Sequence, residues 1–163
     1  MLLGLITTAG ASILMLRAAL GALLLRLRGR DDLPLVVLDG SNIMYWRNGA
    51  PDLGTVRDVV QHLSRQGFRP GVVFDANAGH KLVGRYQHHQ VLARQLGLPQ
   101  DRVLVVNKGE VADGLILRFA QDHGARVVSN DRFRDWADQF PQVTQAGFLI
   151  SGQYHQGALQ LGL

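Results

Sequence analysis

Leu35-Val36-Val37-Leu38-Asp39 is a run of branched apolar residues that ends in a carboxylate, and Gly40-Ser41-Asn42 follows it. Such a run is typical of a strand that is buried on both faces. Three similar runs lead to Asp75, Asp113 and Asp131. Because parallel strands end at one edge of a sheet, where ligands bind, these carboxylates are expected to converge. Carboxylates repel one another unless a cation lies between them, so the pattern predicts a Mg²⁺ or Mn²⁺ site for phosphodiester chemistry.

The composition limits the class of protein. A chain of 163 residues allows one domain plus an appendage. The absence of cysteine excludes disulfides, thiolate zinc sites and catalytic thiols. The net charge of +4 comes from Arg17, Arg26, Arg28 and Arg30, since the remainder is formally neutral. If several acids surround a metal, the remaining surface carries a basic excess, which is compatible with a polyanionic substrate.

The first 25 residues have the composition of a membrane anchor. Between Leu2 and Leu25 the only charged side chain is Arg17. A helix of this length reaches roughly 36 Å, enough to cross a hydrocarbon core of about 30 Å. We predict an anchor helix over residues 1–25 and a basic linker over 26–34, which places the following domain in the cytoplasm, at the inner membrane in a bacterium. A signal peptide would begin with basic residues, and a soluble or interfacial helix would have a polar face; both alternatives fit less well.

After Pro34 the sequence alternates between strand and helix patterns. This alternation predicts an α/β fold with a parallel sheet. Strands are expected at 35–39, 71–75, 102–106, 126–129 and 147–150, and helices at 52–66, 85–96, 111–123 and 131–140. A glycine-containing loop is expected at 76–84. We assign residues 35–151 to the domain and 152–163 to a loosely ordered tail.

Two motifs carry most of the predicted chemistry. Asp39 at a strand end can ligate a metal, or it can merely cap the next helix. Asn42 can cap that helix or orient a phosphate or a ligating carboxylate. Asp131 and Asp135 are four residues apart, so in a helix they would share a face of its first turn. The helix dipole favours acids at that place and explains one of them better than both.

The remaining candidates depend on these motifs. Asp113 begins a predicted helix, where a lone aspartate is most often a cap. Asp75 is either another ligand or a residue that shapes the rim of the site. Lys108 and Glu110 flank Asp113 as supporting candidates. The candidates for substrate binding are Ser41, Lys81, Arg85, Lys108 and Arg132. His88 and His89 lie beside Arg85 and more simply form a solvated helix face, and Arg132 and Arg134 either contact phosphates or are ordinary surface residues.

Three segments together resemble a known family. The strings Val-Val-Leu-Asp39-Gly-Ser-Asn42, Val-Ala-Asp113-Gly-Leu-Ile-Leu and Val-Val-Ser-Asn-Asp131-Arg-Phe-Arg-Asp135 resemble the NYN branch of the PIN-like nucleases. The best likeness is to the ribonuclease domains found beside CCCH zinc fingers in Regnase-type proteins and to their bacterial relatives. It covers roughly residues 34–151 and does not include the N-terminal segment.

The resemblance implies a three-layer PIN-like domain with five parallel strands in the order 3-2-1-4-5. It implies that Asp39, Asp113, Asp131 and Asp135 hold Mg²⁺ or Mn²⁺, that Asn42 supports them, and that single-stranded RNA is the substrate. Family members often dimerise, and no residue here decides whether this chain does. Two features depart from the family: Asp113 stands alone where members often have two adjacent acids, and the zinc finger is missing.

The sequence therefore predicts a metal-dependent ribonuclease, expected to be an endonuclease, held at the membrane by its first helix. One alternative is a degenerate PIN-like module that binds RNA or a protein without cutting, which the single acid at Asp113 favours. Another is a phosphohydrolase of a different doubly wound family. Such enzymes commonly use an aspartate nucleophile paired with a lysine, and no aspartate stands two residues after Asp39 to support this alternative.

Overall fold

β1 (Leu35–Asp39) is the central strand of a five-stranded parallel sheet in the order β3-β2-β1-β4-β5. This is seen in a computed structural model that describes residues 33–163. Val36 and Leu38 pack into the core on one face of the sheet, and Val37 packs into the core on the other. The other strands are β2 (Arg69–Phe74), β3 (Val103–Val105), β4 (Arg126–Val128) and β5 (Leu149–Ile150). The predicted α/β class and strand order are confirmed.

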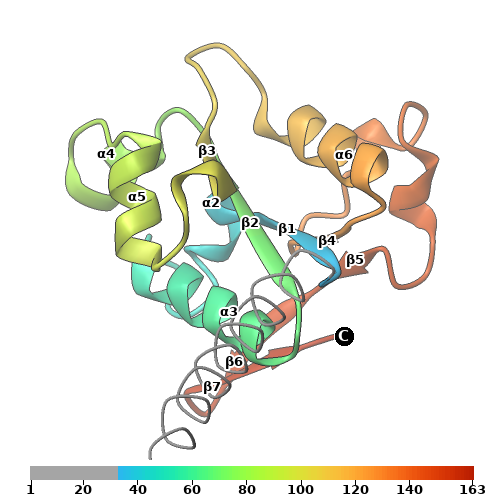
Figure 1. Ribbon diagram of the computed structural model, residues 1–163, viewed down its shortest axis with the longest axis horizontal. Helices are drawn as coiled ribbons and strands as arrows, with labels where there is room; N and C mark the ends of the chain where they lie inside the picture. Colours follow the sequence, from blue (N-terminus) through green and yellow to red (C-terminus); the bar gives the residue numbers. More distant parts are fainter. Residues whose placement is uncertain (1–32) are drawn as a thin grey trace, which may run out of the picture. The chain divides into compact units, whose positions relative to one another are not determined.

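Helices cover both faces of the sheet, which gives three layers (Figure 1). α3 (Leu53–Arg65) and α5 (His89–Leu96) lie on one face, and α6 (Ala112–His123) lies on the other. Two shorter helices, α2 (Gly40–Ile43) and α4 (Ala78–Val83), follow the carboxyl ends of β1 and β2. Three 3₁₀ turns complete the helical elements: Gln100–Arg102, Arg134–Trp136 and Pro141–Thr144.

α3 shows how the sequence specifies these helices. Asp52 caps its N-terminus, accepting hydrogen bonds from the backbone N–H groups of Gly54 at 2.8 Å and Thr55 at 3.0 Å. The apolar residues Val56, Val59, Val60 and Leu63 recur at helical spacing and are all buried. The cap and the apolar face therefore agree with the helix predicted from the spacing.

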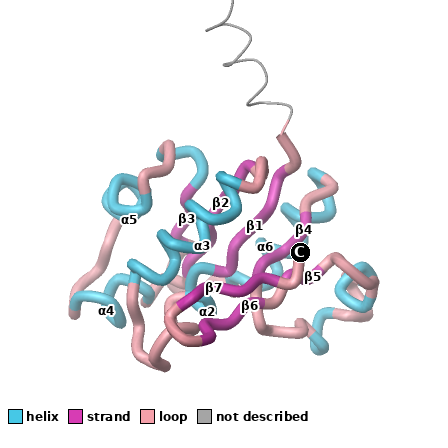
Figure 2. The backbone as a smooth tube through the Cα atoms, turned by 90° about the horizontal axis from the view of Figure 1, so that it is seen from below, coloured by secondary structure: helices cyan, strands magenta, loops and turns pink. Residues whose placement is uncertain are grey.

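The last residues form an element that the sequence prediction missed. β6 (Gly152–His155) and β7 (Ala158–Leu161) pair as an antiparallel hairpin (Figure 2). The hairpin turns tightly because Gln156 and Gly157 both have positive φ, at 49° and 79°. Leu159 and Leu161 pack against the core on the α3 side of the sheet. The expectation of a loosely ordered tail over 152–163 was therefore wrong.

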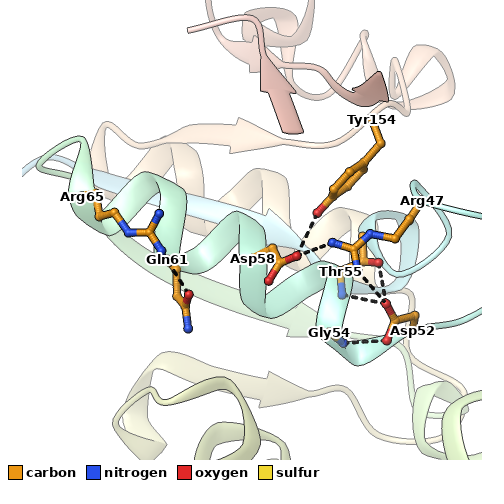
Figure 3. A network of polar contacts seen from close by, with 8 residues as sticks. All are labelled: Arg47, Asp52, Gly54, Thr55, Asp58, Gln61, Arg65 and Tyr154. Atoms are coloured by element: carbon orange, nitrogen blue, oxygen red, sulfur yellow. Dashed lines mark hydrogen bonds and ion pairs between the residues drawn. The ribbon is translucent and has the colours of Figure 1, made fainter. Parts of the chain in front are cut away.

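A polar network joins the hairpin to α3. The hydroxyl of Tyr154 on β6 donates to Asp58 on α3 at 3.5 Å. Arg47 donates to the same carboxylate, and its guanidinium lies 4.5 Å from the centroid of the Tyr154 ring. Figure 3 shows the three side chains side by side, with Asp52 on the other side of Arg47. The hairpin is thus anchored by polar contacts as well as by its two leucines.

Two helix predictions need correction. No α-helix forms over 131–140; a 3₁₀ turn, Arg134–Trp136, stands there because Phe133 adopts a left-handed conformation with φ at 49°. The predicted loop over 76–84 contains α4, and the helix predicted over 85–96 begins only at His89.

The predicted anchor over 1–25 and nearly all of the linker over 26–34 lie outside the residues that the structure describes. Within residues 33–163, no helix combines the length and the apolar character needed to cross a membrane.

Candidate functional site

Asp39 is a buried carboxylate at the carboxyl end of the central strand, with only 6% of its surface exposed. Its two oxygens accept hydrogen bonds from the backbone N–H of Asn42 at 3.1 Å and from the Ser129 hydroxyl at 2.9 Å. Burial raises the pKa of Asp39 from 3.8 to about 6, against the lowering effect of these two bonds, and the charges of Asp113 and Asp75 raise it further. Asp39 is therefore held in a place where a negative charge is poorly stabilised.

Asp113 and Asp131 belong to the same group of carboxylates. Asp113 is half-buried in the first turn of α6, and burial together with the charge of Asp131 raises its pKa. A hydrogen bond from Trp136 acts in the opposite direction, and Asp75 adds to the rise. Asp131 accepts from the backbone N–H of Phe133 at 2.8 Å. Electrostatic effects thus connect four carboxylates from different elements, with Asp113 and Asp75 acting on Asp39, and Asp131 and Asp75 acting on Asp113.

The structure links Asp135 to none of these four. Asp135 is exposed and lies in the 3₁₀ turn after Phe133, so it does not share a helix face with Asp131 as the i, i+4 spacing predicted. Among the described residues, no hydrogen bond or ion pair joins its side chain to the acidic group. Asp75, whose role the sequence left open, is coupled to both Asp39 and Asp113.

Asn42 and Ser41 position the ends of the strands. The side-chain oxygen of Asn42 accepts from the indole N–H of Trp46 at 2.8 Å and from the backbone N–H of Asn130 at 3.1 Å. It therefore braces the turn after β1 against the loop after β4. The Ser41 hydroxyl, predicted to bind substrate, accepts from the backbone N–H of Asp75 at 2.8 Å and joins the ends of β1 and β2.

The predicted basic residues are all exposed. Lys81 on α4 lies 5.9 Å from the ring centroid of Tyr45, which belongs to the turn that follows α2. Lys108 lies in a loop that Glu110 closes by accepting from the backbone N–H and the side chain of Asn107, at 3.0 and 3.2 Å. Glu110 is therefore occupied within its own loop. Arg85 follows the end of α4, three residues before His88, whose ring contacts that of His89.

Arg132 and Arg134 have a clearer relationship to the site. They line an open pocket of about 590 Å³ together with Asp131 and Ser129. Since Asp131 is one of the four acids and Ser129 bonds Asp39, this pocket adjoins the acidic group. Its remaining lining residues include Val143, Thr144 and Leu149.

Three residues near the acids had no assigned role in the sequence prediction. Ser129 bonds Asp39 and also accepts from the backbone N–H of Asp131 at 3.0 Å. Asn130 accepts from Gly152 of β6, and Trp136 bonds Asp113. Ser129 and Asn130 stand directly before Asp131 in its motif, so their position in the sequence could have indicated that they lie at the site. The role of Trp136 depends on a turn that the sequence did not predict.

The acidic group fits a divalent cation in its chemistry. All its candidate ligands are oxygens, which Mg²⁺ and Mn²⁺ prefer. The charges of neighbouring acids raise the pKa of Asp39 and of Asp113, which is the electrostatic condition that a bound cation relieves. As the side chains stand, no three acidic or histidine residues in the described part of the chain are grouped closely enough to hold one ion. The oxygen donors and their negative charge thus suit the metal, and the side chains would have to move closer together to bind it.

Comparison with known proteins agrees with this arrangement. The family described as the Zc3h12a-like ribonuclease NYN domain matches residues 32–147. Two solved structures of nuclear protein-only RNase P 2 from Arabidopsis thaliana are similar, each at 18% identity. Their TM-scores are 0.58 and 0.57, with 90% and 77% of this chain covered.

The chain spans 34% and 29% of the length of those structures, so they establish the likeness of the fold alone. No curated protein sequence matches the chain. The family match covers most of the chain and contains strands β1 to β4 and the four acids described above. The chain therefore belongs to the Zc3h12a-like ribonuclease NYN domain family, a family of RNA-cleaving nucleases.

Proposed function

We propose that the protein is a metal-dependent endoribonuclease that hydrolyses single-stranded RNA. The observation that carries the proposal is the gathering of Asp39, Asp75, Asp113 and Asp131 at one edge of the sheet, where the charges of Asp113 and Asp75 act on Asp39 and those of Asp131 and Asp75 act on Asp113. Acids placed close together repel one another and destabilise a fold, so their presence indicates a function. Carboxylates of raised pKa cluster at functional sites. Membership of a ribonuclease family supplies the substrate class.

The residues divide into ligands and supports. Asp39, Asp113 and Asp131 would hold Mg²⁺ or Mn²⁺, and we assign the fourth position to Asp75 rather than Asp135 because only Asp75 is coupled to the others. When bound, the ion supplies a Lewis acid for the phosphodiester and a more acidic water. Ser129 holds Asp39 through its hydroxyl, and Trp136 favours the charged form of Asp113. Arg132 and Arg134 lie where they can contact phosphates beside Asp131.

Cleavage of a circular RNA tests this activity directly. A circle of unstructured RNA has no ends, so its conversion to linear fragments in Mn²⁺ requires an endonuclease. We expect linear products with Mn²⁺ and none with EDTA. Degradation of linear RNA with an intact circle would indicate an exonuclease, and an intact substrate in both cases would contradict the proposal.

A second candidate is a non-cutting module that binds RNA or a protein. Two observations favour it. In the described residues no three candidate ligands are grouped closely enough to hold one ion, and Asp113 stands alone where family members often have two adjacent acids. Calorimetric titration with Mn²⁺ separates the two candidates. Saturable binding that is lost in Asp39→Asn supports the nuclease, and an absence of binding to the folded protein supports the module.

We also propose that residues 2–25 anchor the protein in a membrane, with the NYN domain in the cytoplasm. The support is the apolar sequence, in which Arg17 is the only charge, and the arginines that follow at positions 26, 28 and 30. The full chain is expected in the membrane fraction after carbonate washing, and a chain without residues 2–25 in the supernatant. Recovery of both in the supernatant would contradict the anchor.

A further inference from the structure

The β6–β7 hairpin lies beyond the segment that matches the family, residues 32–147, and yet it is joined directly to the acidic site. The Asn130 side chain donates to the carbonyl of Gly152 at 2.8 Å and accepts from the Gly152 N–H at 3.0 Å. Asn130 precedes Asp131 and follows Ser129, the partner of Asp39. One side chain therefore joins the first residue of the hairpin to the loop that carries the acid.

A second contact fixes the same end of the hairpin. The Trp46 ring packs against Gly152 so closely that a Cβ at this position would lie 2.1 Å from the ring. The indole N–H of Trp46 in turn donates to Asn42, which also accepts from the backbone N–H of Asn130. Together with the Tyr154–Asp58 contact on α3 (Figure 3), these bonds hold the hairpin at a defined position beside the site.

The hairpin forms one wall of a groove that starts at the acidic site. The pocket of about 590 Å³ beside Asp131 adjoins a second pocket of about 510 Å³, since Asn130 and Ser151 line both. Arg132 and Arg134 give the first pocket its positive charge. The second pocket is lined by residues of the hairpin and its flanks, including Gln153 and Gln160, and no charged side chain is among its lining residues.

The side chains that line the groove change from charged to neutral along its length, which suits the backbone phosphate of one nucleotide and the base of the next. Guanidinium groups bind phosphate, and they lie in the part that adjoins Asp131. Neutral side-chain amides bind the edges of unpaired bases, and they lie in the far part. The amides of Gln153 and Gln160 bond each other across the hairpin at 3.3 Å, a long bond between exposed groups that a base can replace.

We propose that this groove binds the nucleotides next to the cleaved phosphate, with Arg132 and Arg134 on the backbone and the Gln153–Gln160 pair on a base. The hairpin is then a determinant of substrate binding that lies outside the segment matched to the family. The proposal rests on the proposed function, in that single-stranded RNA is the ligand.

Binding is measured without catalysis, by fluorescence anisotropy of labelled single-stranded RNA of about 12 nucleotides with the full chain in detergent and EDTA. Gln153→Glu adds one negative charge inside the groove and is expected to raise Kd about fivefold. Gln121→Glu is the matched control, because Gln121 is exposed near the C-terminal end of α6, whose first turn carries Asp113. It makes the same chemical change and is expected to leave Kd unchanged. Circular dichroism checks that both variants are folded.

Base contact has a separate measurement. Gln160→Ala is expected to change the order of affinity among A, U and C homopolymers, whereas loss of a merely structural residue would weaken all three equally. The proposal that the groove binds RNA would be overturned by a Kd for Gln153→Glu equal to that of Gln121→Glu. It would also be overturned if Gln160→Ala left the order of affinity among the homopolymers unchanged.

The two proposals can fail separately. If the wild-type chain binds RNA and Gln153→Glu weakens binding, but no RNA is cut in Mn²⁺, the groove stands and the nuclease fails. If RNA is cut and Gln153→Glu has the KM of the control, the nuclease stands and the groove fails. If the wild-type chain does not bind RNA, or if it binds a protein or lipid in its place, the groove is overturned.

Discussion

The Ser129 hydroxyl donates to the Asp39 carboxylate at 2.9 Å, joining the ends of two neighbouring strands whose residues are 90 positions apart in the chain. The same oxygen of Ser129 accepts from the backbone N–H of Asp131. One serine thus sets the relative position of two acids. Ser129→Ala is expected to raise the pKa of Asp39 above 6, since a bond that stabilises the charged form is lost. Mn²⁺ titrations at several pH values measure this; binding with an unchanged pH dependence would contradict it.

Asp39 is expected to cost the protein stability. Its pKa is about 6 in the folded state and 3.8 ordinarily, so the folded state binds the proton more tightly. The free energy of unfolding therefore falls as the pH rises from about 4 to above 6, by about 2–3 kcal/mol. Asp39→Asn, which is always neutral, is expected to be more stable than the wild type at pH 7.5 and equal to it near pH 4. Urea unfolding at both pH values measures the difference, and a less stable variant at pH 7.5 would contradict this explanation.

Asp52 provides the opposite case. It caps α3, and its bond with Thr55, followed by those from the backbone, lowers its pKa. Asp52→Asn keeps a capping side chain, whereas Asp52→Ala removes it and is expected to cost about 1 kcal/mol. A rise in stability for Asp52→Ala at pH 7.5 would contradict this, and would indicate that the stability gained in Asp39→Asn does not come from the burial of Asp39.

Trp136 is expected to set the acid limb of activity through Asp113. Its hydrogen bond favours the charged carboxylate, against burial and the charge of Asp131. Trp136→Phe keeps an aromatic ring near Phe140 but removes the donor, so the pKa of Asp113 should rise and the acid limb of kcat/KM should move to higher pH. Trp46→Phe is the control, because the Trp46 donor bonds an amide and not an acid. An equal movement of the limb in both variants would argue against a specific effect on Asp113.

Gly40 is expected to tolerate no side chain. A Cβ there would lie 2.5 Å from the Phe74 ring, which is fully buried. Gly40→Ala should therefore destabilise the protein by about 1–3 kcal/mol and displace the turn after Asp39. Gly71→Ala, where the nearest atom would be 3.7 Å away, should be close to neutral. Thermal unfolding compares the two; equal midpoints would show that the turn is not tightly packed.

The strands were predictable because buried parallel strands consist of continuous branched apolar runs, and Val36, Val37 and Leu38 are all buried as expected. The meeting of Asp39 with Asp113 and Asp131 follows from the same rule, since each stands after or near the end of a parallel strand. The strand order came from the family resemblance and not from the spacing of residues.

The errors arose where one backbone conformation overrides a local pattern. Asp131 and Asp135 have helical spacing, but Phe133 between them is left-handed, which no helix interior accepts. The hairpin turns at Gln156-Gly157, which lacks the asparagine or aspartate that usually announces such a turn. In its strands, Tyr154 stands between polar residues, and Gln160 separates Leu159 from Leu161. This alternation is too short to distinguish a strand from a disordered tail unless the core that the leucines pack against is known.

The most direct test of the nuclease is a single comparison with the full chain in detergent. Labelled single-stranded RNA is incubated with the wild type and with Asp39→Asn, each in Mn²⁺ and in EDTA. We predict cleavage by the wild type in Mn²⁺ only, and no cleavage by a variant that is folded and at least as stable. Cleavage by Asp39→Asn at the wild-type rate, or an intact RNA with folded wild-type protein in Mn²⁺, would contradict the account.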